Sequence, residues 1–152
     1  MDGDGDIDTA YQELQAYTLG RRDEEFLHQY VVDAWAAQTA HADTKPIALT
    51  FALMGLYLHA EHGWTGRQVQ RGHMALALNK PAWPALHIPE RRGTMTPGTV
   101  MCAAEGDARD AAIRAWARDV WAAYAEMNKP RLHTWLQAHG LHCDRPLLSS
   151  KL

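Results

Sequence analysis

The feature that most constrains this chain is the run from Ile47 to Leu58, which is apolar on every side of a helix. At about 12 residues the run is too short to span a bilayer, which needs roughly 20 apolar residues in a helix. Pro46 suits the first turn of a helix, and Gly63 suits a left-handed cap after the last turn, so we expect a helix over residues 45–62. Since a helix that is apolar all round must be enclosed by protein, this segment should be the central, buried helix.

The remaining chain carries the patterns of helices that would enclose this one. Thr65 and Gln68 have the spacing of a capping box, and Trp64 stands where it can pack on Val69 as a hydrophobic staple. Helical periodicity or a helix-starting residue marks the segments 9–19, 23–41, 65–79, 96–104, 107–129 and 131–139. Pro130 should break or kink the chain between the last two segments. No segment alternates over a useful length, so the sequence predicts an all-α bundle of about five or six helices.

Residues 81–96 interrupt this pattern with several prolines and Trp83. Their backbone cannot be regular, yet their apolar side chains need burial, so we interpret them as an ordered strap laid across the bundle. The length of 152 residues fits a single domain. We expect the helical bundle over residues 9–140, with an acidic disordered tail over 1–8 and a C-terminal tail over 141–152.

Composition and charge exclude several classes of protein. Fifteen basic and eighteen acidic residues give a formal charge of -3 without a basic stripe, so nucleic acid is not an expected partner. The N-terminal residues have neither a positive region nor an apolar run, so we expect no signal peptide, no membrane partner and a cytoplasmic location. The tripeptide Ser150-Lys151-Leu152 would direct the chain to the peroxisome only if the host is eukaryotic and the signal is read.

The two cysteines give no familiar signature. Cys102 and Cys143 lie 41 positions apart without a Cys-x-x-Cys spacing, so they indicate neither a disulfide framework nor a cysteine-based zinc site. We expect Cys102 to be a small buried residue of a short helix and Cys143 to lie in a polar tail.

The stretch from His28 to Gln38 reads His-Gln-Tyr-Val-Val-Asp-Ala-Trp-Ala-Ala-Gln, with Asp33 five residues after the histidine. It resembles the signature of an uncharacterised bacterial family, the domain-of-unknown-function family 5946. The resemblance extends through the strap to residues 120–124 and to Trp135, and covers about residues 24–137. Many relatives carry an N-terminal Cys-Pro-x-Cys-Gly knuckle, which suggests a metal there, and this sequence lacks those cysteines. The resemblance implies a helical fold and no known activity, and it draws attention to His28, Asp33 and Gln38.

Histidines on two neighbouring helices suggest a metal site. His59 and His62 are three residues apart and therefore share one face of their helix. If the chain makes a hairpin near Asp43, His28 reaches the level of His59, and Glu24 faces the same way as His28. Glu24, His28, His59 and His62 would then form a ligand set suited to a divalent transition metal such as zinc, iron or manganese. The alternative is a structural histidine cluster, in which His62 interacts with the dipole of its helix.

Inward-facing polar residues suggest a second site. Asp33 and His73 should lie at the same height in the bundle, as a structural polar contact or as a general base with its orienting partner. Trp35 and Gln38 could line a ligand pocket, the alternative being that the tryptophans only fill the core. Gly55 permits either a close helix crossing or room for a ligand.

The sequence thus favours a homo-oligomeric protein that binds a small molecule or a divalent metal inside the bundle, with its reaction unassigned. Two alternatives stay open. One is a metal-dependent enzyme that uses the histidine cluster with metal-bound water as the nucleophile. The other is a non-catalytic interaction protein that uses an exposed tryptophan surface.

Overall fold

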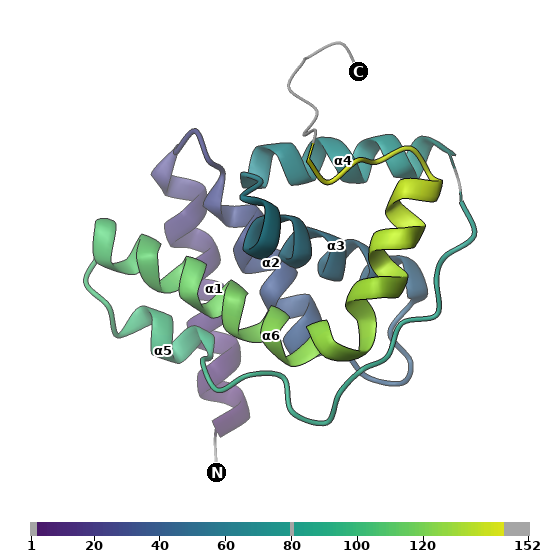
Figure 1. Cartoon of the computed structure of the whole chain (residues 1–152). Helices are drawn as coiled ribbons and strands as arrows, with labels where there is room; N and C mark the ends of the chain where they lie inside the picture. Colours follow the sequence, from purple (N-terminus) through teal and green to yellow (C-terminus); the bar gives the residue numbers. More distant parts are fainter. Residues whose placement is uncertain (1–2, 80, 145–152) are drawn as a thin grey trace.

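The computed structural model describes residues 3–79 and 81–144, and these residues form six helices without a strand (Figure 1). The prediction of an all-α bundle of five or six helices is therefore confirmed. The helices are α1 (Gly3–Arg21), α2 (Leu27–Gln38), α3 (Pro46–His62), α4 (Gly66–Asn79), α5 (Pro97–Met101) and α6 (Asp107–Ala138). None of the helices in the described part of the chain combines the length and the apolar character needed to cross a membrane.

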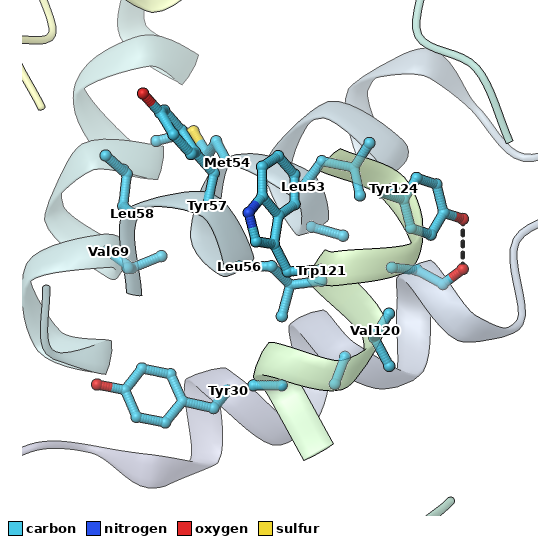
Figure 2. Packing of buried hydrophobic residues seen from close by; sticks show 14 of the residues in the cluster. Tyr30, Leu53, Met54, Leu56, Tyr57, Leu58, Val69, Val120, Trp121 and Tyr124 are labelled. Atoms are coloured by element: carbon cyan, nitrogen blue, oxygen red, sulfur yellow. Dashed lines mark hydrogen bonds between the residues drawn. The ribbon is translucent and has the colours of Figure 1, made fainter. Parts of the chain in front are cut away.

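Helix α3 is the central helix, as its apolar sequence predicts. It packs against α2, α4 and α6, and the eight residues 52–59 are all buried. Figure 2 shows Leu53 and Tyr57 of α3 close to Trp121 of α6 in this core. The dashed line marks the 2.5 Å hydrogen bond that the Tyr124 hydroxyl donates to the Ala37 carbonyl, which ties α6 to α2. The core therefore joins helices that are distant in sequence.

Helices α2 and α3 approach each other closely at Gly55. A Cβ atom on Gly55 would lie 1.9 Å from the Asp33 Oδ2 atom and 3.1 Å from the Val69 Cγ1 atom. The missing side chain therefore provides the space that the Asp33 carboxyl occupies. Of the two roles expected for Gly55, the structure realises the close helix crossing.

Two helices begin elsewhere than expected. Helix α1 starts at Gly3, so residues 3–8 are helical and the prediction of a disordered tail is wrong for these residues. Residues 1 and 2 lie outside the described part of the chain. Acidic side chains at a helix N-terminus are favoured by the helix dipole, and Ile7 is half-buried there. Helix α2 starts at Leu27 instead of Asp23, because Phe26 adopts a left-handed conformation with φ of 61°. The N-cap is therefore Phe26 and not Asp23, although the Asp23 carboxylate accepts a 2.9 Å hydrogen bond from the Leu27 N–H at the start of the helix.

The start of α4 agrees with its sequence pattern. The Gln68 N–H donates to the Thr65 Oγ1 atom over 3.1 Å, and the Thr65 N–H donates to the Gln68 Oε1 atom over 2.8 Å. These two bonds are the reciprocal capping box predicted for the pair. Trp64 and Val69, the two residues of the expected staple, are both fully buried.

Helix α6 continues through Pro130 to Ala138, so the proline bends the helix and does not break it (Figure 1). Proline has no N–H to donate, and its ring clashes with the carbonyl of the preceding turn, which forces such a bend. After the bend, the second half of α6 runs in a different direction (Figure 1), and His133 on this half lies close to His62 at the end of α3.

Residues 81–96 form the ordered strap that the sequence predicts. The Asn128 side chain binds the strap at His87 twice, accepting from its N–H over 2.6 Å and donating to its carbonyl over 2.8 Å. The Asp119 carboxylate accepts hydrogen bonds from the N–H groups of Thr94 and Met95, over 2.7 and 2.8 Å. Side chains of α6 thus satisfy backbone groups that an irregular segment cannot pair internally.

The chain after α6 is packed against the bundle, which contradicts the expected tail for residues 141–144. Gly140 has a φ of 83°, and the Leu141 N–H donates to the Leu136 carbonyl over 2.9 Å, as in a Schellman motif. Leu141 and Cys143 are buried, whereas Cys102 is exposed and follows the last residue of α5, so the expected positions of both cysteines are wrong. The rest of the tail, with the peroxisomal tripeptide, lies outside the described residues.

Candidate metal centre

Three metal-ligating side chains meet where α3 and α6 end. His62, His133 and Cys143 each offer a ligand atom, and these atoms all lie within 4.8 Å of one another. Within residues 3–79 and 81–144, this is the one group of three or more His, Cys, Asp or Glu residues that gathers so closely. The three residues come from separate parts of the chain, so the fold itself assembles the group.

Two glycine turns lie beside the group. Gly63 has a φ of 70° and ends α3 directly after His62, while Gly140 turns the chain back after α6. Behind the first turn, the Trp64 Nε1–H donates a 2.7 Å hydrogen bond to the Cys143 carbonyl. This buried bond fixes the backbone of Cys143 beside α3, so the thiol position is set by packing as well as by the turn.

The distance between Cys143 and His133 suits a four-coordinate metal ion. The Cys143 Sγ atom lies 3.6 Å from the His133 Nδ1 atom. A tetrahedral zinc ion with the usual bond lengths places a sulfur ligand about 3.5 Å from a nitrogen ligand, and two nitrogen ligands about 3.3 Å apart. The Cys143–His133 separation already matches this geometry, and the separations to His62, which are at most 4.8 Å, would have to shorten by no more than about 1.5 Å.

The Tyr57 hydroxyl lies between the two imidazoles. It is 2.6 Å from the His133 Nδ1 atom and 3.1 Å from the His62 Nε2 atom, so it can donate to one ring and accept from the other. On the far side of the His133 ring, the Gln137 Nε2 atom is 3.0 Å from Nε2. A polar partner at that position, with the side-chain amide turned to present its oxygen, orients a metal-binding histidine.

The electrostatics of the group favour metal chemistry over a free thiolate. Burial raises the pKa of the Cys143 thiol, although a hydrogen bond with Tyr57 acts in the opposite direction. Burial likewise raises the pKa of Tyr57. A thiol that holds its proton is a poor nucleophile, whereas a bound cation would supply the positive charge that stabilises the thiolate. His62 is exposed, so the group is open to solvent on that side.

The four residues predicted as metal ligands do not assemble. His62 belongs to the group described above, but His28 binds the Thr18 hydroxyl over 2.9 Å. The His59 ring stacks on Tyr30 with ring centres 3.8 Å apart, and its buried Nε2 atom has no hydrogen-bond partner. Glu24 is exposed. His28 lies in the first turn of α2 and its side chain faces α1, so the structure does not bring Glu24, His28 and His59 together with His62.

The predicted Asp33–His73 pair is also absent. Asp33 accepts a 3.0 Å hydrogen bond from Gln29, and its second oxygen is buried without a partner. His73 binds the Phe51 carbonyl over 2.9 Å and stacks on the Phe51 ring at 4.4 Å. Burial raises the pKa of Asp33 well above its ordinary value and lowers that of His73 to about 4. The two residues have separate hydrogen-bond partners, so they do not form the predicted contact.

Trp35 and Gln38, the predicted ligand-binding residues, do line one cavity. Its volume is about 460 Å³, and its walls are formed by Ile7, Asp8, Trp35, Gln38, Thr39 and Thr96. The Gln38 amide is already used, since it donates to the Met95 carbonyl over 2.7 Å and accepts from the Trp116 indole over 3.2 Å. Trp35 stacks on Tyr11 at 4.4 Å. Gln38 therefore anchors the strap, and a ligand in this cavity would meet few unused polar groups.

Comparisons with known proteins identify the chain at the level of its family. The model of a family of unknown function, DUF5946, matches residues 8–125. No curated protein and no solved structure matches. His62 and Tyr57 lie inside the matched range, while His133 and Cys143 lie beyond it.

Proposed function

This chain belongs to the DUF5946 family, whose function is unknown, and we propose that it binds a divalent transition metal through His62, His133 and Cys143. The observation that carries the proposal is the convergence of three ligand atoms within 4.8 Å, from three segments of the chain. A protein that holds two imidazoles and a buried thiol in this arrangement has a donor set of the kind used by zinc sites.

The donor chemistry selects among the metals expected from the sequence. Thiolate and imidazole together suit zinc, and they suit iron(II) and cobalt(II) as well. Manganese prefers oxygen ligands, so a site that includes Cys143 disfavours it. Binding requires the Cys143 thiolate, so affinity should fall as the pH is lowered and the thiol keeps its proton.

Metal analysis of protein purified without a polyhistidine tag tests the proposal. We expect about one equivalent of zinc per chain after incubation with zinc and removal of the excess. With cobalt(II), the wild type should show the near-ultraviolet absorption band of a thiolate-to-metal charge transfer. C143S should lack this band. Less than about a tenth of an equivalent with zinc, iron or cobalt refutes the proposal.

Matched variants separate this site from adventitious binding. C143S and H133Q should abolish stoichiometric binding, because each removes one of three ligands. C102S and H87Q are the controls, since both side chains are exposed and lie outside the group. Equal metal content in the two sets of variants would place the metal elsewhere on the protein.

A thermal unfolding measurement gives an independent readout. A ligand that binds only the folded state stabilises it by about 2.7 kcal/mol when its free concentration is 100 times the dissociation constant. Addition of zinc should therefore raise the Tm of the wild type and of C102S, and a chelator should reverse the increase. C143S should show neither change.

A further inference from the structure

The Tyr57 hydroxyl occupies the position where a metal ion would enter. Its oxygen is within hydrogen-bond distance of one ring nitrogen of each histidine, at 2.6 Å from His133 Nδ1 and 3.1 Å from His62 Nε2. Hydrogen bonds to imidazole lie close to the direction in which a ring nitrogen coordinates a metal. An ion at about 2.1 Å from each nitrogen would therefore overlap the present position of the oxygen, which must move when the ion binds.

The tyrosine ring leaves the oxygen little freedom to move away. Tyr57 is 1% exposed and lies beside Met54 and Trp121 in the core (Figure 2). The rings of His62 and His133 pack edge-on against it, at centre distances of 5.0 and 6.1 Å. Because the ring is packed on these sides, Tyr57 cannot change rotamer and its hydroxyl can make only a small shift. The oxygen therefore stays within bonding range of the ion.

On the basis of the proposed metal function, we infer that Tyr57 is the fourth ligand and completes a closed site of two nitrogens, one sulfur and one oxygen. An oxygen ligand in a tetrahedral zinc site lies about 3.3 Å from each nitrogen ligand. To reach that geometry, the distance from the Tyr57 oxygen would lengthen by about 0.7 Å for the His133 nitrogen and by about 0.2 Å for the His62 nitrogen. The four ligand atoms would then surround the ion with no position left for water or substrate.

Coordination by Tyr57 changes the proton balance of binding. The metal–oxygen bond forms as the phenol O–H bond breaks, and the metal–sulfur bond forms as the Cys143 S–H bond breaks. Both protons leave to solvent on the exposed side of His62, while each neutral imidazole keeps its proton on the nitrogen that faces away from the ion. The two ligand charges then neutralise a divalent ion, which is favourable in a partly buried site.

A closed site is of the structural type, because catalytic zinc sites keep one position for water or substrate. The ion would join the end of α3 to the second half of α6 and to the segment that follows Gly140. The inference therefore favours a metal-stabilised domain over the metal-dependent enzyme that the sequence also allowed.

The test compares Tyr57→Phe with Tyr124→Phe in the full chain. Both changes remove the hydroxyl of a buried tyrosine, but Tyr124 donates its hydrogen bond to the Ala37 carbonyl and does not contact the group. We would measure zinc affinity by competition with a chromogenic chelator, and proton release in weak buffer. The ultraviolet difference spectrum on zinc binding reports formation of tyrosinate.

For the wild type and Tyr124→Phe we expect two protons released per zinc ion and a tyrosinate signal. Tyr57→Phe should bind at least about tenfold more weakly, release one proton and give no such signal. Equal or tighter binding by Tyr57→Phe would overturn the inference, because the hydroxyl would then be only a competitor that the ion displaces. That result would leave the three-residue metal centre intact, whereas a wild type that binds no zinc would refute the centre itself.

Discussion

Replacement of Gly55 by alanine should destabilise the protein through a single contact. The new Cβ atom would lie 1.9 Å from the Asp33 Oδ2 atom and 2.8 Å from the Asp33 Cγ atom. Both distances are far below van der Waals contact, so the carboxyl must move. Asp33 is 3% exposed and its other oxygen is bound by Gln29, so any movement strains the crossing of α2 and α3 or breaks that hydrogen bond.

The expected size of the effect follows from three contributions. Overpacking a filled core costs about 1 to 3 kcal/mol. Loss of the Gln29–Asp33 hydrogen bond costs about 1 kcal/mol more. Alanine is favoured over glycine inside a helix by about 1 kcal/mol, which offsets part of the cost. The free energy of unfolding should therefore fall by about 1 to 3 kcal/mol in Gly55→Ala.

A double-mutant cycle isolates this contact. In an Asp33→Ala background the obstructing carboxyl atoms are absent, so Gly55→Ala should stabilise the protein through the higher helix propensity of alanine. The close contact of the new Cβ atom with the Val69 Cγ1 atom, 3.1 Å away, should reduce this gain. Urea denaturation of the four proteins should give a coupling energy of about 2 kcal/mol or more. If the two changes add to within about 0.5 kcal/mol, the carboxyl does not occupy the space at Gly55 and the reasoning is wrong.

Three other contacts give direct expectations. Asp33→Asn should raise the free energy of unfolding at pH 7 and leave it unchanged near pH 3. Burial raises the pKa of the native carboxyl above 3.8, so the native state of the wild type loses stability as the pH rises above that value. Equal urea stabilities at pH 7 would contradict the desolvation. Asn128→Ala should lower the free energy of unfolding by about 2 kcal/mol and speed hydrogen exchange of the His87 amide. A loss of stability without faster exchange would contradict the attachment of the strap through Asn128. Trp64→Phe removes the hydrogen bond to the Cys143 carbonyl and should weaken zinc binding about tenfold, as measured by competition with a chelator. An unchanged affinity would show that this bond does not position the thiol.

The sequence predicts the parts of this fold that depend on local pattern. The apolar run of α3 identifies the central helix because no other arrangement hides all of its sides. Thr65 and Gln68 identify the start of α4 because a capping box is a local interaction between residues three positions apart. The prolines of residues 81–96 likewise predict an irregular strap, and the contacts that hold it come from α6.

The errors arise where one backbone conformation redirects the chain. Phe26 is not a residue that sequence reasoning associates with a left-handed conformation, yet its φ of 61° delays α2 until Leu27. The His28 side chain points to Thr18 of α1, whereas Tyr30, two residues further along α2, stacks on His59. The two helices therefore meet at about the predicted level, and it is the predicted facing of His28 that is wrong. Counting residues along two helices gives the height of a residue in the hairpin but not the direction of its side chain. The later start of α2 also leaves Glu24 outside the helix, so Glu24 does not share a helix face with His28.

The candidate metal centre needs information that helical periodicity does not contain. Periodicity indicates which face of a helix is apolar, but His133 reaches His62 only because Pro130 bends α6 toward α3, and a proline alone does not give the direction of a bend. Cys143 joins them because Gly140 reverses the chain and Trp64 binds the carbonyl beyond the turn. A local signal for this return was present in Gly140 followed by Leu141, the pattern of a Schellman motif with its apolar residue after the glycine. That pattern predicts a segment folded back on its own helix, and a thiol two residues further along would then have been placed beside the bundle and tested against the histidines at the end of α3.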